Sequence, residues 1–154
     1  MSSTVTIPQV PHGLQYVGAS LLSTVFVLVG QNFTVSKWRK RAGIKYPQMY
    51  AEKAEVAASR DALIFNCAQR AHQNTLENIP IVYVTTVLTG LKYPILAATA
   101  CGIWSVSRIA YTRGYLTGDP AKRANVVYIF GSISMLGLLL TSVYTVGQSI
   151  CSSL

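Results

Sequence analysis

The feature that most constrains this chain is an apolar run at residues 14–35, which is 22 residues long and contains no charged side chain. A helix needs around 20 apolar residues to cross the roughly 30 Å hydrocarbon core of a bilayer. This run therefore predicts a transmembrane helix. The composition agrees, because only 12% of the residues are charged, whereas a soluble domain usually has about 25%. We predict an integral membrane protein.

Three further segments have the length and hydrophobicity expected of membrane spans. They cover about residues 61–88, 94–111 and 124–150, and glycine and proline residues separate them. No internal repeat is visible, and 154 residues leave room for one domain. The sequence therefore predicts an all-α membrane protein, a four-transmembrane-helix bundle that forms a single domain over residues 1–154.

Basic side chains are concentrated in two of the predicted loops. Residues 36–60 carry seven of them and residues 108–123 carry four, whereas the opposite face has Lys92 and almost nothing else. By the positive-inside rule, loops one and three face the cytosol and both termini face away from it. Topology thus explains the net charge of +8, and we predict no nucleic-acid binding. No basic segment precedes the first apolar run, so we expect no cleaved signal, which fits the endoplasmic reticulum or the mitochondrial outer membrane.

The second predicted span carries polar side chains on one side. Ionised side chains inside a span nearly always face a bundle interior or a water-filled cavity. One interpretation is an internal Arg70–Glu77 pair that fixes helix packing. The other is a site for a ligand with carboxylate and ammonium groups, because an arginine recognises a carboxylate and a glutamate accepts from an ammonium. At about 100° per residue, an arc of roughly 100° holds five polar residues: Asn66, Arg70, Gln73, Asn74 and Glu77.

His72 lies off this arc. We interpret it as an interhelical hydrogen-bond partner, because no second ligand stands nearby at metal spacing. The three cysteines, Cys67, Cys101 and Cys151, have no metal spacing either. No metal site is predicted.

A second polar group lies at the end of the third predicted span. Arg108, Tyr111 and Tyr115 are spaced i, i+3 and i+7 and share one helix face. An interfacial belt of aromatic and basic residues would account for any one of them. It accounts less well for their continuation into the polar loop at residues 114–123.

Two stretches of the chain resemble a known family. Residues 65–77 read FNCAQRAHQNTLE, are followed by Pro80, and resemble the signature helix of the MAPEG family, the membrane-associated proteins of eicosanoid and glutathione metabolism. RIAYTRGY at residues 108–115 and TGDPAKR at residues 117–123 resemble the third-span and loop signature of its microsomal glutathione transferase type 3 branch. The resemblance covers nearly the whole chain. It implies a four-helix protomer that assembles as a homotrimer, with glutathione sites at the subunit interfaces near the cytosolic face.

The resemblance also implies which residues bind glutathione. By position, Arg70, Asn74 and Glu77 would hold the tripeptide, and Tyr111 and Tyr115 would contact it from the third span.

Other positions concern the thiol. Arg39 matches an arginine that reaches the thiol region from the neighbouring subunit, and His72 occupies a position where relatives have a polar residue lining the site. The arginine that relatives use to ionise the thiol falls on Lys122, or on Arg123 if the loop shifts by one residue. We favour Arg123 for its fixed charge and planar donor fork. Relatives that conjugate leukotriene A4 carry a tyrosine where this chain has Asn78, which removes one expected contact.

The function implied by the resemblance is that of a membrane-bound glutathione transferase. Glutathione would be the co-substrate, and its thiolate would attack a hydrophobic electrophile or reduce a lipid hydroperoxide, in detoxification or lipid metabolism. The alternative is a non-catalytic lipid- or glutathione-binding membrane protein with a regulatory or scaffolding role. A transporter or channel subunit is a third possibility, but broken helix pairs and inverted repeats are absent from the sequence.

Overall fold

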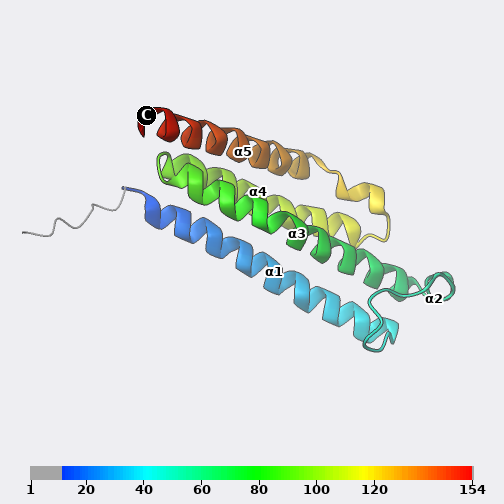
Figure 1. Ribbon diagram of the computed structural model, residues 1–154. Coiled ribbons are helices and arrows are strands. Elements are labelled where there is room, and N and C mark those ends of the chain that lie inside the picture. The colour runs from blue at the N-terminus through cyan, green and yellow to red at the C-terminus, as the bar shows by residue number, and fades with distance from the viewer. Residues whose placement is uncertain (1–11, 154) are drawn as a thin grey trace, which may run out of the picture.

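Four long helices lie side by side along most of the chain (Figure 1). The structure, a computed structural model, describes residues 12–153, and this part of the chain contains helices and connecting loops but no strand. The four long helices are α1 (Leu14–Ala42), α3 (Arg60–Gly90), α4 (Pro94–Tyr115) and α5 (Val126–Ser153). Two short elements, α2 (Lys53–Ala58) and the 3-10 helix η1 (Pro120–Arg123), lie in the loops.

The helix boundaries follow the predicted spans closely. The second predicted span, 61–88, lies within α3, and the third, 94–111, lies within α4, which continues to Tyr115. The helix α1 extends beyond residue 35 to Ala42 and carries three basic side chains in its last turn. The fourth predicted span, 124–150, begins two residues before α5, which runs from Val126 to Ser153, and η1 at residues 120–123 precedes both.

Side-chain caps explain two of these starts. The Ser59 hydroxyl accepts a hydrogen bond from the Ala62 backbone N–H at 3.4 Å and begins α3. The Asn125 side-chain oxygen accepts from the Tyr128 N–H at 2.9 Å and begins α5. Such residues satisfy backbone donors that have no partner inside the helix. Because the Asn125 amide also donates to the Ala110 carbonyl, the same residue fixes the start of α5 against α4.

Small residues allow the helices to approach closely. Gly131 of α5 packs on α4 so tightly that a Cβ atom there would lie 1.9 Å from the Ser107 hydroxyl oxygen. Ala71 and Ala97 are fully buried between helices. Helices in membranes associate through such close packing, since lipid supplies no hydrophobic driving force between them. The helices α3 and α4 both contact α1 and α5, and therefore form the centre of the protein.

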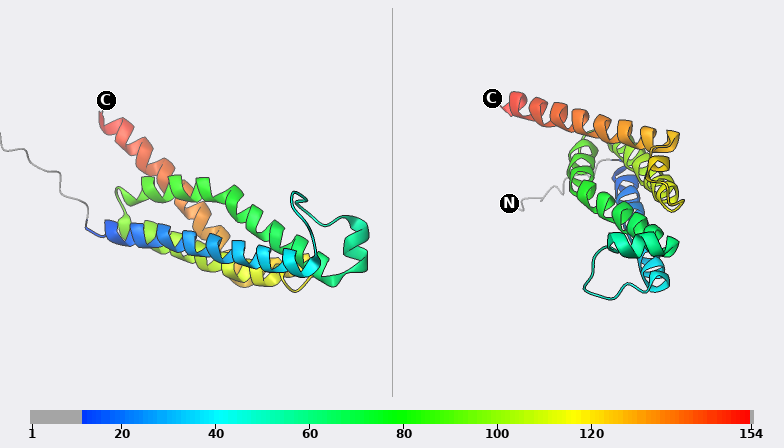
Figure 2. Two further views of the ribbon diagram at one scale, coloured as in Figure 1. Left: turned by 90° about the horizontal axis from the view of Figure 1, so that it is seen from below. Right: turned by 90° about the vertical axis from the view of Figure 1, so that its right-hand side faces the viewer.

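Two of the four long helices, α1 and α5, are long and apolar enough to cross a membrane. Their outward surfaces are rich in apolar side chains, such as Phe26 and Phe33 on α1 and Leu140 and Val143 on α5. Figure 2 shows α5 inclined to α1 rather than parallel with it. The helices α3 and α4 contain more polar residues, and membrane crossing by these two stays a prediction, as does the single domain over residues 1–154.

The loops divide between the two ends of the helices. The α1–α3 connection with α2, and the α4–α5 connection with η1, lie at one end (Figure 1). The α3–α4 connection and the C-terminal end of α5 lie at the other. The two strongly basic loops therefore share one end of the protein, and the proposed site described next lies toward that end.

Candidate functional site

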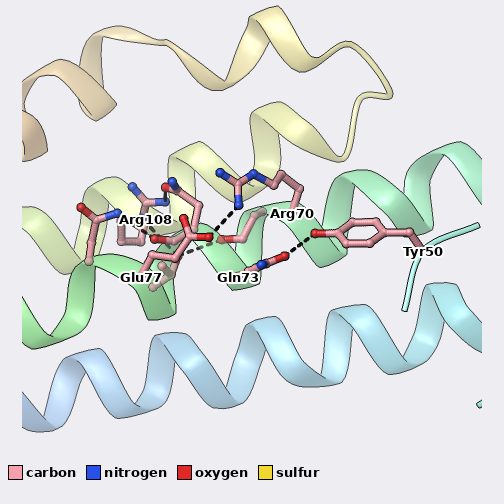
Figure 3. Close-up of polar contacts among 9 residues, drawn as sticks. Tyr50, Arg70, Gln73, Glu77 and Arg108 are labelled. Carbon is pink, nitrogen blue, oxygen red and sulfur yellow. Dashed lines mark hydrogen bonds and ion pairs between the residues drawn. The ribbon is translucent and has the colours of Figure 1, made fainter. Parts of the chain in front are cut away.

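Four polar side chains of α3 form an outward-facing surface, which we call the α3 polar face: Arg70, Gln73, Asn74 and Glu77. An Arg70 guanidinium nitrogen (Nη1) lies 2.9 Å from Glu77 Oε1. The two side chains are seven residues apart, or about two turns, and so lie on one side of the helix. Figure 3 shows Arg70 and Glu77 directed toward one another, and it also draws Arg108 of α4, which contacts Asn74.

This face points away from the protein's own helix packing. Arg70 and Glu77 are 44% and 46% exposed, whereas Ala68, Ala71 and Thr75 on the other side of α3 are buried. We expected the charged pair to face a bundle interior or a water-filled cavity. Within one chain the packed interior is instead formed by the small residues, so the ionised pair lies on a protomer surface.

The loop before α2 contributes Tyr50 to the α3 polar face. The Tyr50 hydroxyl donates a hydrogen bond to Gln73 Oε1 (Figure 3). Partial burial raises the pKa of Tyr50 above its ordinary value, opposed by the nearby Arg70 charge. Tyr50 therefore stays protonated at neutral pH and remains a donor.

Asn66, one turn before Arg70, fixes the position of this loop. Its side-chain oxygen accepts from the Ala51 N–H at 2.7 Å, and its amide donates to the Ala51 carbonyl at 2.9 Å. The paired bonds bind the loop backbone in a defined orientation next to Tyr50. Asn66 thus has a structural role on the predicted arc.

Arg108 connects the α3 polar face with α4. Its guanidinium donates to Asn74 Oδ1 at 2.8 Å and to the Thr75 hydroxyl at 3.2 Å. The side chain is only 3% exposed, and it stacks on the Tyr111 ring at 3.9 Å from the ring centre. Because Asn74 Oδ1 accepts from Arg108, the Asn74 amide group is free to donate elsewhere.

The tyrosines predicted to contact glutathione lie in an aromatic cluster at the same end. Tyr111 contacts Tyr115 with ring centres 5.1 Å apart, and it contacts Tyr128 of α5 at the same separation. Tyr111 and Tyr115 are 4% and 8% exposed. In one chain they therefore support the site from beneath, with little ring surface open to a ligand.

The loop with Lys122 and Arg123 folds back onto α4 at Gly114. A Cβ atom on Gly114 would lie 2.3 Å from the Lys122 carbonyl oxygen, so only glycine permits this approach. The Arg123 guanidinium carbon lies 5.8 Å from the centre of the Tyr115 ring, within cation–π range. Both Lys122 and Arg123 are exposed, which leaves their charges available to a ligand.

His72 joins a buried network between α1, α3 and α4. Its Nδ1 lies 3.4 Å from Gln31 Oε1, and the Gln31 amide donates to the hydroxyls of Thr75 and Thr112 at 2.9 and 2.8 Å. This geometry agrees with an interhelical hydrogen-bond role for His72. The histidine points toward α1, away from the Arg70–Glu77 pair.

Arg39 lies in a different environment from the α3 polar face. Its guanidinium is held between the rings of Tyr46 and Phe65, at 4.4 and 4.5 Å from their centres, and donates to the Gln48 carbonyl at 2.6 Å. The side chain is 7% exposed. Within one chain Arg39 is therefore not brought together with Arg70, Asn74 and Glu77.

Some contributors to the site gave no clear signal in the sequence. Tyr50 lies in a loop without periodicity, and its contact with Gln73 spans 23 residues. The sequence predicts Arg108 on a helix face with Tyr111 and Tyr115 but does not predict its contact with Asn74, which spans 34 residues. In the part of the chain that the structure describes, no three His, Cys, Asp or Glu side chains are grouped to hold a metal ion.

The fold and the site together define a helical membrane protein that presents a charged, amide-rich helix face near one end. The sequence model of the MAPEG family matches residues 17–144. The chain therefore belongs to the MAPEG family. Proteins of this family are integral to membranes, and the family includes membrane glutathione transferases and related enzymes.

Proposed function

We propose that this protein is a membrane-bound glutathione transferase, similar to the microsomal type 3 branch, whose glutathione site is the α3 polar face. The observation that carries the proposal is the Arg70–Glu77 pair on an exposed helix face, with Asn74 between the two residues. Glutathione has two carboxylates, one ammonium group and two peptide bonds. A guanidinium, a carboxylate and an amide can bind one group of each kind: a carboxylate, the ammonium and a peptide bond.

The exposure of this face supports assembly of several copies, as in the homotrimer that the family resemblance implies. Ionised side chains within a membrane span are costly when they face lipid. A neighbouring copy that covers Arg70 and Glu77 would leave a polar space between subunits, closed to lipid and open to the basic end of the protein. Arg39 contributes nothing to this face in its own chain, and it would have to leave the Tyr46 and Phe65 rings to reach the site of an adjacent copy.

The chemistry requires the thiolate form of glutathione. A free thiol has a pKa near 8.5, and only the thiolate is nucleophilic. Arg123, exposed beside Tyr115, would stabilise the negative sulfur, with Lys122 as the neighbouring alternative. The thiolate then attacks an electrophilic carbon to form a thioether, and the bond that breaks releases a leaving group or, in an addition, leaves an anion that takes up a proton from water. With a lipid hydroperoxide, two glutathione molecules yield the lipid alcohol, water and oxidised glutathione.

An apolar acceptor needs an apolar surface that the bilayer can reach. A groove of about 670 Å³ lies between α1 and α4, with mostly apolar walls that include Phe26, Val106 and Ile109. It ends at Thr112, Arg113 and Leu116, near the end of α4 that carries Tyr115. This groove is the part of the protomer best suited to an electrophile with a hydrocarbon tail.

The test is a titration of the purified protein in detergent with glutathione, followed by ultraviolet absorbance of the thiolate. A thiolate band at neutral pH that disappears in Arg70→Ala is the expected result. Binding without a thiolate band would favour the alternative of a non-catalytic glutathione-binding protein. Absence of binding would exclude the α3 polar face as a glutathione site.

A further inference from the structure

A small polar cavity of about 180 Å³ lies between α3, α4 and α5. It is distinct from the exposed Arg70–Glu77 pair, which does not line it. It is large enough for several water molecules or for a small ion. Six of its lining side chains are polar: Asn74, Asn78, Ser107, Arg108, Tyr128 and Ser132.

The only charged side chain that lines this cavity is Arg108. Its side chain is 3% exposed. In the described residues 12–153, the ion pairs are Arg41–Asp61 and Arg70–Glu77, and Arg108 has no carboxylate partner there. A buried charge without a counter-charge is strongly unfavourable, most of all inside a membrane span.

Neutral groups compensate this charge only in part. A guanidinium has five N–H donors, and the bonds to Asn74 and Thr75 occupy two of them. The ring of Tyr111 lies 3.9 Å from the guanidinium carbon and contributes a cation–π contact. The site therefore retains hydrogen-bond donors and a net positive charge.

Two of the other polar lining groups can donate to an anion, because Tyr128 and Asn74 carry an O–H and an amide that can donate into the space. Ser107 and Ser132 each donate to a backbone carbonyl of their own helix, so they supply no further donor. No Asp or Glu is among the lining residues. The wall thus combines one fixed cation with neutral donors.

We propose that this cavity binds a small monovalent anion, chloride, which neutralises Arg108 and strengthens the junction of α3, α4 and α5. Asn74 lines this cavity and is also a proposed glutathione ligand. A glutathione carboxylate carries the same negative charge as chloride, so chloride is tested in the absence of glutathione.

The first experiment measures thermal unfolding of the full-length protein without glutathione, at constant ionic strength, in sodium chloride and in sodium gluconate. Gluconate is much larger than chloride, and we expect it not to fit among the side chains that line this cavity. At a chloride concentration ten times the Kd, we expect a saturable rise in Tm of roughly 2–5 °C over gluconate. An equal Tm in the two salts would overturn the proposal.

Two variants at Ser132 locate the effect. Ser132→Leu fills the cavity from α5 and should abolish the chloride-dependent rise, whereas Ser132→Ala leaves the space open and should retain it. A chloride effect that persists unchanged in Ser132→Leu would place the ion elsewhere and refute the site. If only glutathione raises the Tm, and Ser132→Leu removes that rise, the cavity binds a glutathione carboxylate and the chloride proposal is wrong.

A second measurement does not depend on any variant. Crystals of the unaltered protein grown in sodium bromide should give an anomalous bromide peak beside the Arg108 guanidinium. Such a peak is expected from the proposal even if Ser132→Leu fails to fold. Bromide peaks confined to the protein surface would contradict it.

Discussion

The Arg70 guanidinium and the Glu77 carboxylate lie 2.9 Å apart on a face of α3 that the protomer leaves uncovered. An exposed ion pair contributes about 0–1 kcal/mol to folding, so the stability of one chain does not explain two charges on a helix that we predict to cross the membrane. Their arrangement is better explained by what covers this face. In the proposal above, the covering groups are glutathione and a neighbouring copy.

Glu77→Gln removes one charge of the pair and keeps its shape. We expect the Kd for glutathione to rise by about 10- to 100-fold, the effect of losing a charge-assisted hydrogen bond of roughly 1.5–3 kcal/mol. Isothermal titration calorimetry would measure the Kd. The matched control is Asp61→Asn, which breaks the exposed Arg41–Asp61 pair at 3.2 Å and should leave the Kd unchanged. Equal binding by Glu77→Gln and the unaltered protein would exclude Glu77 as a glutathione ligand.

Arg123→Gln and Lys122→Gln separate the two candidates for thiol activation. Loss of a cation at the sulfur should reduce the thiolate band and lower kcat by roughly 100-fold, as for other electrostatic stabilisers. The Kd for glutathione should change little. We expect the large effect in Arg123→Gln, because Arg123 is held near Tyr115. Lys92→Gln, an exposed basic residue at the other end of the helices, is the control.

The reverse result is equally informative. A large effect in Lys122→Gln alone would assign the role to the lysine. Full activity in the double variant Lys122→Gln/Arg123→Gln would show that this loop does not activate the thiol.

Gly114→Ala tests the position of the same loop. The added Cβ would meet the Lys122 carbonyl oxygen at 2.3 Å and its carbon at 2.7 Å, and backbone atoms cannot turn aside as a side chain can. We expect the loop to shift and turnover to fall, while glutathione binding by α3 is largely retained. Gly137→Ala on α5 has nothing within 4 Å of its new Cβ and should be neutral or stabilising by up to about 1 kcal/mol. Activity in Gly114→Ala equal to that of Gly137→Ala would show that the loop position is unimportant.

The sequence predicts the parts of this structure that depend on local pattern. The bounds of α3 differ from the predicted 61–88 by one residue at the start and two at the end, because apolar length and a serine cap define them. The joint position of Arg70, Asn74 and Glu77 follows from helical periodicity alone. The predicted start of the fourth span, residue 124, lies two residues before Val126, because Asn125 supplies the cap of α5.

Contacts between distant segments could not be predicted in this way. The outward direction of the α3 polar face depends on which side of α3 packs against α1 and α4, and a single helix pattern does not define that. The same holds for Tyr50, whose position depends on the Asn66–Ala51 bonds, and for the close approach of Lys122 to Gly114. These features arise from the path of loops, which has no period.

Tyr50→Phe tests the loop contribution to the site. Burial raises the pKa of Tyr50 in the folded protein. The hydroxyl is therefore protonated at every pH below the ordinary tyrosine pKa of about 10. Its hydrogen bond to Gln73 stabilises the fold over that range and is lost only as the pH rises above it. We therefore expect Tyr50→Phe to weaken glutathione binding by about 3- to 10-fold at neutral pH, through loss of the Gln73 contact worth roughly 1 kcal/mol. The ratio of the two Kd values should be constant between neutral pH and mildly alkaline pH. A ratio that approaches one in this range would indicate that Tyr50 ionises there.

Gln31→Leu tests the buried network beneath the site. Gln31 donates to Thr75 and Thr112, whose own hydroxyls already donate to carbonyls of their helices. Removal of the amide therefore leaves neither threonine O–H without an acceptor. Each hydrogen bond between membrane helices contributes about 0.6 kcal/mol on average, with 1–2 kcal/mol at most. We expect the free energy of unfolding to fall by roughly 1 kcal/mol, measured by denaturant titration in detergent. Asn32→Leu, at the neighbouring exposed position, should have no such effect.

A double-mutant cycle with Thr112→Val makes this test specific. If the 2.8 Å bond between Gln31 and Thr112 stabilises the packing of α1 on α4, the two substitutions should be less than additive, with a coupling energy of about 0.6–1.7 kcal/mol. Strict additivity would show that the bond contributes nothing and that Gln31→Leu acts through packing alone. Thr75 also accepts a hydrogen bond from Arg108, and Arg108 donates to Asn74. A coupled network would therefore connect the packing of the helices with the orientation of Asn74, a proposed glutathione ligand. Gln31→Leu should then weaken glutathione binding slightly, although Gln31 lies in the interior and not on the α3 polar face.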